Sequence, residues 1–418
     1  MQKKQERWRA YCGLGALIVV CGLTPLVLRA RAGAVITATQ TKATKSPQLV
    51  TPTRLSLRKA GRAAPQFALA LPGYRYAFPR DHGSHESYAT EWWYYTGHLQ
   101  GSGGQRFGYQ VTLFRVALAP QTPPRASHWA TRDVYFGHLA LTDASGGRYL
   151  FCDRISRGAL GLAGADRAGT SQPRVFLGSW QVRFSGTQGQ IQTVQASGKS
   201  QDGTPFGVAL KLSSSLAPTL QGENGVSQKS AGLGHASHYY SYCRLASSGS
   251  VMVGNQKLSV DGLSWFDHEF GSNQLAANQV GWDWFSLQLN DGRALMLYRM
   301  RRKDGSDDPY SSGTLVDANG RARHLKLADF AIRATKTWRS PHSGATYPVR
   351  WTLTLPREGL SLDVSPALND QELQTTRSSG VTYWEGACDV AGTQNGRPLR
   401  GQAYVELTGY ARAFAGTF

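Results

Sequence analysis

The sequence predicts an all-β protein with two domains, preceded by an N-terminal apolar segment. Its 418 residues are enough for two cores of ordinary size. From about residue 72 onward, apolar residues recur at every second position, which is the period of a strand with one buried face. Glycine-rich turns separate these runs, and the 47 glycines of the chain suit many short strands joined tightly. Together these observations indicate a sandwich or a barrel in each domain.

Residues 1–34 have the pattern of a secretory signal or a membrane anchor. Four basic residues precede an apolar run at 12–28, and small residues follow it. The run is close to the shortest length that spans a bilayer, about 17 residues, so cleavage and retention as an anchor both remain open. We therefore expect export to the periplasm or cell envelope, where an uncleaved segment would hold the chain at the inner membrane. Residues 35–71 have no apolar period and are rich in Thr, Ala, Lys, Arg and Pro, which predicts a linker.

The first folded domain is predicted at 72–255 and the second at 256–418. Alternation is plainest in the runs 107–113, 206–212, 349–355 and 403–407. Turn signals lie at 101–104, 143–147, 290–292 and 317–320, and the triplet at 290–292 is the strongest hairpin signal. No segment after residue 72 has a long amphipathic helical pattern with caps. The Gly- and Ser-rich stretch 222–236 is typical of a long loop late in the first domain.

Charge and motif content exclude several classes of function. The formal net charge is +19, but residues 1–62 hold twelve Lys or Arg and one acid, so the folded part is only mildly basic. No dense basic run accompanies a nucleic-acid reader module, so we expect no nucleic-acid partner. The chain also lacks a complete Gly-x-Ser-x-Gly motif and a complete phosphate-binding loop, which argues against a serine hydrolase and a nucleotide enzyme.

The spacing of cysteine and histidine predicts no metal centre. Cys152, Cys243 and Cys388 are far apart and form no Cys-x-x-Cys pair. One disulfide with a thiol left over and three buried thiols both remain open. His82 and His85 are three residues apart, a spacing that suits a helix rather than the loop expected here. We therefore expect neither a metal nor an organic cofactor.

A first polar and aromatic cluster runs from residue 78 to 99. On a strand, Glu91 shares a face with Trp93 and Tyr95, while Trp92 and Tyr94 point the other way. The cluster is consistent with a ligand site that contains a carboxylate. It is equally consistent with a plug of aromatic side chains in a barrel, with a hydrogen-bonded Glu and no ligand.

A second cluster at 261–271 places Asp267, His268 and Glu269 in a row among aromatic residues. Charged groups in such surroundings are costly unless they are paired or used. Burial would raise the pKa of a carboxyl group there, so that it could serve as an acid near neutral pH. A surface turn with solvated charges, or a structural ion pair, is the competing interpretation.

Several long motifs carry a resemblance to a known family. They are EWWYYTGH at 91–98, FGYQ at 107–110, YYS at 239–241, GLSWFDHEFG at 262–271, GWDWFS at 281–286 and YVELTGY at 404–410. Together they resemble the family that joins the bacterial carotenoid 1,2-hydratases of the CrtC type to the AttH-like secreted hydrolases. The resemblance covers nearly all of the folded chain. It implies two lipocalin-like antiparallel β-barrels in tandem and an apolar small-molecule ligand.

The second cluster departs from the commonest form in the secreted branch, W-M-D-R-E-W-G, at three positions. Phe266, His268 and Phe270 stand there, and the histidine makes the stretch more similar to the carotenoid hydratases. Those enzymes place a Tyr-x-Asp pair on a following strand, whereas this chain has Tyr298 and then no carboxylate. This argues against the carotenoid reaction, but not against hydration of another substrate.

The resemblance implies an enzyme that adds water to a double bond of an isoprenoid or similar apolar substrate. A protonated carboxyl group would supply the acid, and aromatic faces would stabilise the carbocation. We predict Asp267 or Glu269 as the acid, His268 as the group that orients or deprotonates water, and Glu91 as the backup acid. The predicted ligand contacts are Trp93, Tyr95, Tyr239, Trp265, Phe270, Trp282, Trp284 and Tyr298. The competing hypotheses are a non-catalytic periplasmic carrier of a lipid or isoprenoid that serves an export system, and a structural protein of the cell envelope.

Overall fold

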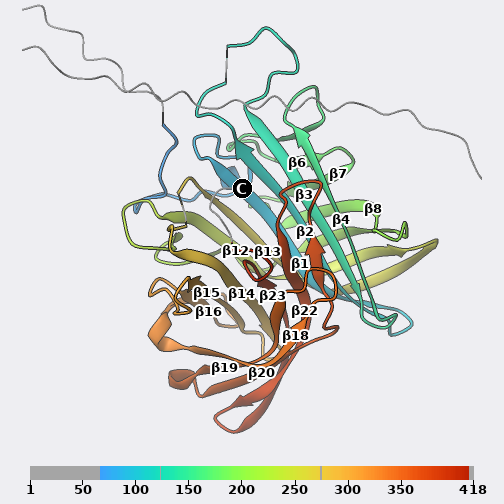
Figure 1. The fold of residues 1–418 in the computed structure, drawn as a ribbon, viewed down its shortest axis with the longest axis vertical. Coiled ribbons are helices and arrows are strands. Elements are labelled where there is room, and N and C mark those ends of the chain that lie inside the picture. Colours follow the sequence, from blue (N-terminus) through green and yellow to red (C-terminus); the bar gives the residue numbers. More distant parts are fainter. Residues whose placement is uncertain (1–65, 123, 274, 414–418) are drawn as a thin grey trace, which may run out of the picture. The chain divides into compact units, whose positions relative to one another are not determined.

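A computed structural model describes residues 66–122, 124–273 and 275–413. The predicted signal or anchor and most of the predicted linker lie outside this part of the chain. The described residues form two antiparallel sheets and three short 3-10 helices, η1 (Arg80–His82), η2 (Leu327–Asp329) and η3 (Pro356–Glu358) (Figure 1). The predicted all-β class is therefore confirmed. Within the described ranges, no helix is long and apolar enough to cross a bilayer.

The first sheet is an up-and-down meander whose first and last strands pair. Its path runs β4-β3-β2-β1-β13-β12-β9-β8-β7-β6-β5, and β10 and β11 pair with β12. The strands are β1 (Thr90–Gly101), β2 (Arg106–Ala117), β3 (Asp133–Asp143), β4 (Arg148–Arg157), β5 (Ala163–Ala165), β6 (Arg174–Leu177), β7 (Trp180–Ser185), β8 (Ile191–Lys199), β9 (Pro205–Ser213), β10 (Thr219–Leu220), β11 (Val226–Gln228), β12 (Ala236–Val253) and β13 (Gln256–Gly271).

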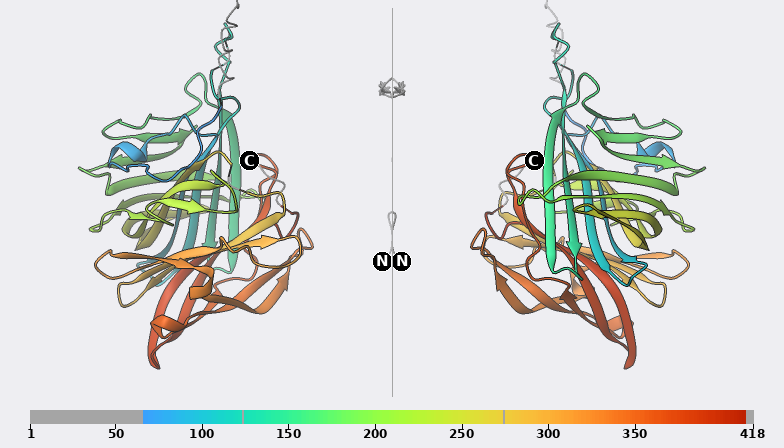
Figure 2. Two further views of the ribbon diagram at one scale, coloured as in Figure 1. Left: turned by 90° about the vertical axis from the view of Figure 1, so that its left-hand side faces the viewer. Right: turned by 90° about the vertical axis from the view of Figure 1, so that its right-hand side faces the viewer.

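The second sheet repeats this topology. Its path runs β17-β16-β15-β14-β23-β22-β20-β19-β18, and β21 pairs with β22. The strands are β14 (Gln279–Leu289), β15 (Ala294–Arg302), β16 (Ser312–Val316), β17 (Ala322–Lys326), β18 (Ala331–Arg339), β19 (Thr346–Leu355), β20 (Leu360–Pro366), β21 (Glu372–Gln374), β22 (Thr382–Gln394) and β23 (Arg397–Leu407). In each sheet the first strand pairs with the last strand, and the fourth and fifth strands are the two edges of the sheet. The expectation of two barrel-like sheets in tandem is confirmed, and Figure 2 shows both sheets strongly curved.

The change from one sheet to the other comes later than the predicted boundary at residue 255. Gly254 and Asn255 form the tight turn between β12 and β13, and β13 pairs with both β1 and β12. The chain therefore enters the second sheet between Gly271 and Gln279. The stretch 222–236, interpreted as a loop before the boundary, contains β11 and leads directly into β12. The hairpin at 290–292 is present, and Gly292 adopts a φ of 92° there.

Both sheets curl around packed interiors. Trp93, Tyr95 and Trp180 lie in the first core, and Trp351 and Trp384 lie in the second. A third buried cluster lies where the sheets meet and includes Tyr94, Tyr239, Trp265, Trp284 and Tyr298. Because side chains alternate along a strand, β1 supplies Trp93 and Tyr95 to the first core and Tyr94 to this seam between the sheets. All three cysteines in the described ranges are free thiols.

Candidate active site

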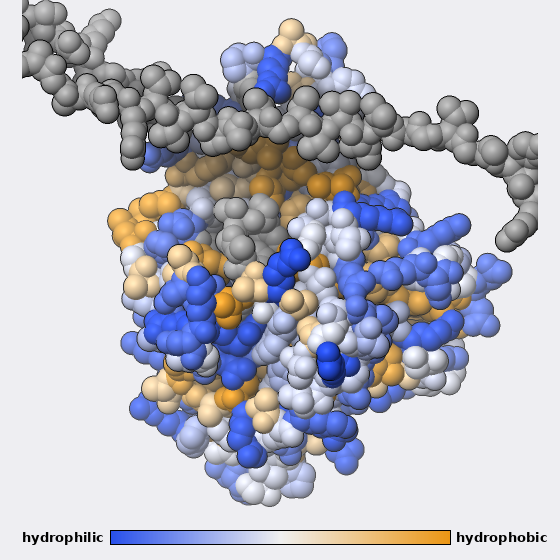
Figure 3. Space-filling model, in the orientation of Figure 1, coloured by the Kyte–Doolittle hydropathy of each residue, from blue (hydrophilic) through white to orange (hydrophobic). Residues whose placement is uncertain are grey.

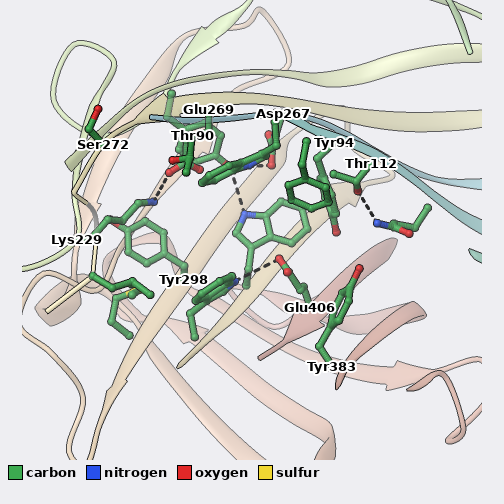
Figure 4. Close-up of a pocket in the computed structure, with 18 of the residues that line it drawn as sticks. Thr90, Tyr94, Thr112, Lys229, Asp267, Glu269, Ser272, Tyr298, Tyr383 and Glu406 are labelled. Carbon is green, nitrogen blue, oxygen red and sulfur yellow. Dashed lines mark hydrogen bonds and ion pairs between the residues drawn. The ribbon is translucent and has the colours of Figure 1, made fainter. Parts of the chain in front are cut away.

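A cavity of about 390 Å³ lies between the two sheets rather than inside either barrel-like core. Strands β1, β2, β12 and β13 line it from the first sheet, and β14, β15, β22 and β23 line it from the second (Figure 4). Its lining residues are Thr90, Trp92, Tyr94, Gln110, Thr112, Phe114, Lys229, Tyr239, Asp267, Glu269, Ser272, Asn273, Leu275, Trp282, Trp284, Tyr298, Met300, Tyr383 and Glu406. Most of them are aromatic or apolar, and the few charged groups are grouped on β13, β23 and the loop before β12.

The antiparallel register places an acid opposite an aromatic residue in both sheets. On the first and last strands of the first sheet, Tyr94 pairs with Asp267 and Trp92 pairs with Glu269. The corresponding strands of the second sheet pair Trp284 with Glu406. Directly opposed side chains on one face of an antiparallel pair lie within contact distance. The tandem repeat therefore brings two similar aromatic and acidic surfaces together across the seam.

Asp267 is the most buried acid of the cavity wall in the first sheet. One carboxylate oxygen accepts hydrogen bonds from Ser241 Oγ (2.5 Å) and Trp265 Nε1 (2.6 Å), and the other accepts one from the Tyr239 hydroxyl (2.7 Å). Burial raises the pKa of Asp267 to about 7, although these three hydrogen bonds act in the opposite direction. The group therefore exchanges a proton near neutral pH, as the sequence predicts for a carboxyl in this cluster.

Glu269 differs from Asp267 because a cation compensates its charge. Lys229 Nζ lies 3.1 Å from Glu269 Oε1, and the Ser237 hydroxyl donates a hydrogen bond to the same oxygen. The ammonium group also lies 4.2 Å from the centre of the Tyr298 ring and 5.2 Å from that of Tyr239. Burial alone would lower the pKa of Lys229, but the nearby Glu269 carboxylate raises it above its ordinary value.

The second sheet contributes a pair of acids, the half-buried Glu406 and the buried Glu385, that the sequence does not single out. Glu406 lines the cavity, and Trp282 Nε1 donates a hydrogen bond to it at 3.3 Å. Glu385 lies opposite Glu406 in the register and accepts a hydrogen bond of 2.5 Å from the Tyr94 hydroxyl. Burial raises the pKa of Glu406 to about 7, and burial together with the neighbouring Glu406 raises the pKa of Glu385 well above its usual range.

His268 and Glu91, both predicted as catalytic groups, lie on the opposite face from the cavity. His268 Nε2 is 2.9 Å from Glu91 Oε1, and both side chains are buried against the first core. Arg115 Nε donates to Glu91 at 3.0 Å, and His85 Nδ1 lies 2.7 Å from the same carboxylate. Burial by itself would raise the pKa of Glu91, but Arg115, His85 and His268 hold it below its ordinary value. This arrangement matches the competing interpretations of the two sequence clusters, in which Glu91 belongs to a barrel plug and His268 to a structural ion pair.

The nitrogen and oxygen atoms of His85, Glu91 and His268 lie close enough together to hold a metal ion. The surroundings fit an ion-pair network better. Arg115 already neutralises Glu91, and its Nη2 donates to the carbonyl oxygens of His85 and Tyr88. The remaining ring nitrogen of His268 lies 2.9 Å from the Tyr240 hydroxyl. Adding a cation would place two positive charges beside one carboxylate.

The other predicted ligand contacts divide between the two faces. Tyr239, Trp282, Trp284 and Tyr298 line the cavity. Trp265 lies directly behind Asp267 and donates its indole N–H to it. Trp93 and Tyr95 lie in the first core, and Phe270 stacks on the His85 ring at a centroid distance of 3.6 Å. The alternation of β1 and β13 explains this division, since neighbouring residues on a strand point to opposite faces.

Among the polar groups at the cavity that sequence reasoning missed are Lys229, Gln110, Tyr383 and Glu406. In the motif at 404–410, Tyr404 and Glu406 alternate with the core residues Val405 and Leu407. This alternation places Tyr404 and Glu406 on the face that points away from the second core, so the sequence did contain a signal for Glu406. Lys229 gave no such signal, because it lies in a Gly- and Ser-rich segment and reaches the cavity only through the packing of the loop before β12.

Comparisons with known proteins agree with the fold. The sequence profile of the AttH-like family matches residues 69–410. A crystal structure of a protein from Nitrosomonas europaea classed as AttH has 34% identity and a TM-score of 0.71, and the match covers 82% of this chain and 100% of that one. Kievitone hydratase from Nectria haematococca shares the fold at 16% identity and a TM-score of 0.59, over 83% of this chain and 96% of that one. A search of curated proteins gave no significant match. The extent of the profile match and the identity to the Nitrosomonas structure show that the chain belongs to the AttH-like family.

Proposed function

We propose that the protein is an exported, cofactor-independent hydratase that adds water to a carbon–carbon double bond of an isoprenoid or similar apolar substrate. The observation that carries the proposal is Asp267, whose pKa burial raises to about 7 in a cavity walled by aromatic rings. The shared fold of kievitone hydratase is consistent with it. Export is proposed from the sequence of residues 1–34.

Asp267 is the proposed acid. In its protonated form it transfers a proton to one alkene carbon, directly or through the Tyr239 hydroxyl at 2.7 Å, and becomes a carboxylate. The other alkene carbon becomes a cation. The Tyr239 hydroxyl in turn accepts a hydrogen bond from Trp284 Nε1 at 3.2 Å, so its orientation is fixed.

The cavity wall can stabilise the developing cation. Trp92, Trp282 and Trp284 present indole rings to the cavity. A cation over such a ring is stabilised by about 2 kcal/mol where water is excluded. The Tyr298 ring contributes less, since Lys229 already lies over it at 4.2 Å.

Water attack requires a second group that holds water and accepts its proton. The sequence points to His268, but its ring lies on the opposite face, so we assign this step to Glu269. Its carboxylate lines the cavity and forms an ion pair with Lys229 Nζ at 3.1 Å. Asp267 and Glu269 are two residues apart on one face of β13, about 7 Å along the strand, which leaves room for a substrate carbon and a water between them. Water adds to the cation, its proton passes to Glu269, and the product is an alcohol. Glu269 returns that proton to solvent, and Asp267 takes one up for the next turnover.

The test is incubation of the purified protein with a panel of isoprenoid alkenes, followed by mass spectrometry. We expect a product heavier than the substrate by one water, and we expect Asp267→Asn to lower turnover about 100-fold or more. Asp291→Asn, in the exposed hairpin far from the cavity, is the matched control. Full turnover by Asp267→Asn would refute the assignment of the acid.

A carrier is the second candidate, and the hydrogen bonding of Asp267 favours it. Ser241, Trp265 and Tyr239 donate hydrogen bonds to Asp267, and Lys229 pairs with Glu269, as a purely structural pair of acids would require. A carrier would use the aromatic walls to bind a lipid or isoprenoid and would pass it to an export system. Native mass spectrometry of the purified protein would then show a bound lipid, and no alkene would gain a water.

A further inference from the structure

The exposed apolar side chains are gathered at one end of the strands. The strand register defines this end: Thr90, where β1 begins, pairs with Val116 near the end of β2 and with Gly271 at the end of β13. We call it the Thr90 end. The start of β14 lies at the same end, because Gln279 donates a hydrogen bond to the Lys229 carbonyl at 2.7 Å.

Apart from Ile155 on β4, every large apolar residue that is exposed within the described ranges lies in a loop or segment at the Thr90 end. These residues are Leu69, Leu71, Leu118, Trp129, Leu160, Leu162, Leu233 and Tyr310. Leu233 is 75% exposed and Trp129 is 55% exposed. Figure 2 shows the loop between β2 and β3, which carries Leu118 and Trp129, extending beyond the sheets.

The opposite end of the strands has a different composition. Five of the turns there, at 102–105, 144–147, 254–255, 290–292 and 395–396, consist of Gly, Ser, Ala, Asn, Asp and Gln. Those at 200–204, 317–321 and 356–359 also contain no large apolar residue. In Figure 3, apolar surface is more abundant in the upper part of the described surface than at the lower end. Scattered apolar residues need no explanation, but a concentration at one end marks an interaction surface.

The cavity opens at the Thr90 end. Of its lining residues, Asn273 is exposed and Leu275 is half-buried, and both lie in the loop that follows β13. Gln110 and Thr112, which line its far part, are fully buried. An apolar ligand would therefore enter and leave through the end that carries the exposed Trp and Leu side chains.

The charge at this end, and the tryptophan beside it, favour a membrane surface over a protein partner. In the loop between β2 and β3, Arg125 is exposed, whereas Arg132 pairs with Glu86 at the same end of the strands. Arg157 donates to the Trp129 carbonyl at 3.0 Å and lies 5.8 Å from the centre of its ring, so Trp129 is held beside a cation. Tryptophan with arginine is typical of the bilayer interface, where the ring sits among headgroups and the cation meets phosphate.

The described chain also begins at the Thr90 end. Ala68 accepts a hydrogen bond from Ser272 Oγ at 2.6 Å, and Ser272 lines the cavity. The apolar run at 12–28 precedes this point in the sequence, so a chain held by that run would reach the folded part at the same end.

We propose that the Thr90 end docks on the surface of an anionic lipid bilayer, with the cavity mouth facing the lipid. That the cavity then exchanges an apolar ligand with the bilayer rests on the proposed function, whereas the docking itself does not.

The experiment uses the full chain and vesicles of phosphatidylcholine and phosphatidylglycerol whose acyl chains carry bromine, a quencher of tryptophan emission. The emission quenched in the natural chain minus that in Trp129→Phe reports Trp129 alone, even if residues 12–28 also bind the vesicle. We expect the emission of Trp129 to be quenched clearly. In the double variant with Leu118→Ser and Leu233→Ser, the quenching of Trp129 should fall at least about twofold. Arg125→Gln should weaken it and Arg397→Gln, at the opposite end, should not.

Each other outcome overturns the proposal. If the chain sediments with vesicles but Trp129 is not quenched, residues 1–65 alone hold it to lipid. If Trp129 is unquenched and the mass in solution doubles, a second copy covers the Thr90 end. Equal quenching by vesicles of phosphatidylcholine alone would overturn the preference for anionic lipid. No step of the measurement requires turnover, so its failure is separate from failure of the hydratase assignment.

Discussion

Tyr94 of the first sheet donates a hydrogen bond of 2.5 Å to Glu385 of the second, across 291 positions of sequence. The other carboxylate oxygen of Glu385 is buried and has no hydrogen-bond partner among the described residues. Burial and Glu406 keep the pKa of Glu385 well above its usual range. This contact joins the two cavity walls.

Tyr94→Phe should lower the free energy of unfolding by about 1–3 kcal/mol, because Glu385 would lose its hydrogen bond while remaining buried. Urea denaturation measures the change. Adding Glu385→Leu should recover part of the loss, since the unsatisfied acid is then removed. If the two changes are additive, the contact contributes no coupling energy.

Asp267→Asn should flatten the dependence of stability on pH. Burial raises the pKa of Asp267 to about 7, so the folded protein retains a proton that the unfolded chain loses above about pH 4. Stability should therefore fall as pH rises from about 4 to about 7, by up to about 1.4 kcal/mol per pH unit for this group. Urea midpoints across that range should show a smaller fall in Asp267→Asn than in the natural chain. An unchanged slope would mean that Asp267 titrates normally.

Turnover should have an upper pH limit near 7 if Asp267 is the acid. Only the protonated carboxyl can donate, so the rate should fall about tenfold per pH unit above its pKa. Initial rates at saturating substrate measure this limb. Glu406, whose pKa burial also raises to about 7, could produce the same limb. Glu406→Gln therefore serves as the control, and its limb should be unchanged.

Lys229→Met should leave Glu269 as a buried charge with only the Ser237 hydroxyl beside it. We expect a loss of about 3 kcal/mol in the free energy of unfolding. In the folded fraction, turnover should also fall, because the ammonium group no longer holds the Glu269 carboxylate in place at the cavity wall. Lys303→Met, an exposed lysine outside the cavity, should alter neither property.

Arg115→Met tests whether the ion-pair cluster around Glu91 acts independently of the cavity. Removing the guanidinium leaves Glu91 buried without its main counter-charge, so we expect a loss of about 3–5 kcal/mol. The loss should leave ligand affinity of the folded fraction unchanged, since Glu91 and His268 face away from the cavity. Chemical denaturation and fluorescence titration with an apolar dye measure the two properties. A loss of ligand affinity in folded Arg115→Met would place the cluster in the site after all.

Much of the fold and part of the site could be predicted from the sequence. The period of two identified the sheets, and the tandem motifs indicated two similar units. The alternation also placed Glu91 with Trp93 and Tyr95 on one face of β1, as the structure has them. The boundary between the units was placed too early, because the turn at 254–255 is as strong a local signal as any linker.

The sequence by itself determined which residues share a face: a strand fixes the relative orientation of its side chains at every position. It did not determine which face of β13 meets the second sheet, so Asp267, His268 and Glu269 could not be divided between cavity and core. That division, and the arrival of Lys229, Glu385 and Glu406 beside Asp267, were decided only by the tertiary structure. The reason is physical: the seam forms from contacts between residues that lie from 45 positions apart, as in Tyr239 with Trp284, to 291 positions apart, as in Tyr94 with Glu385. No local pattern in the chain encodes how two curved sheets pack against each other.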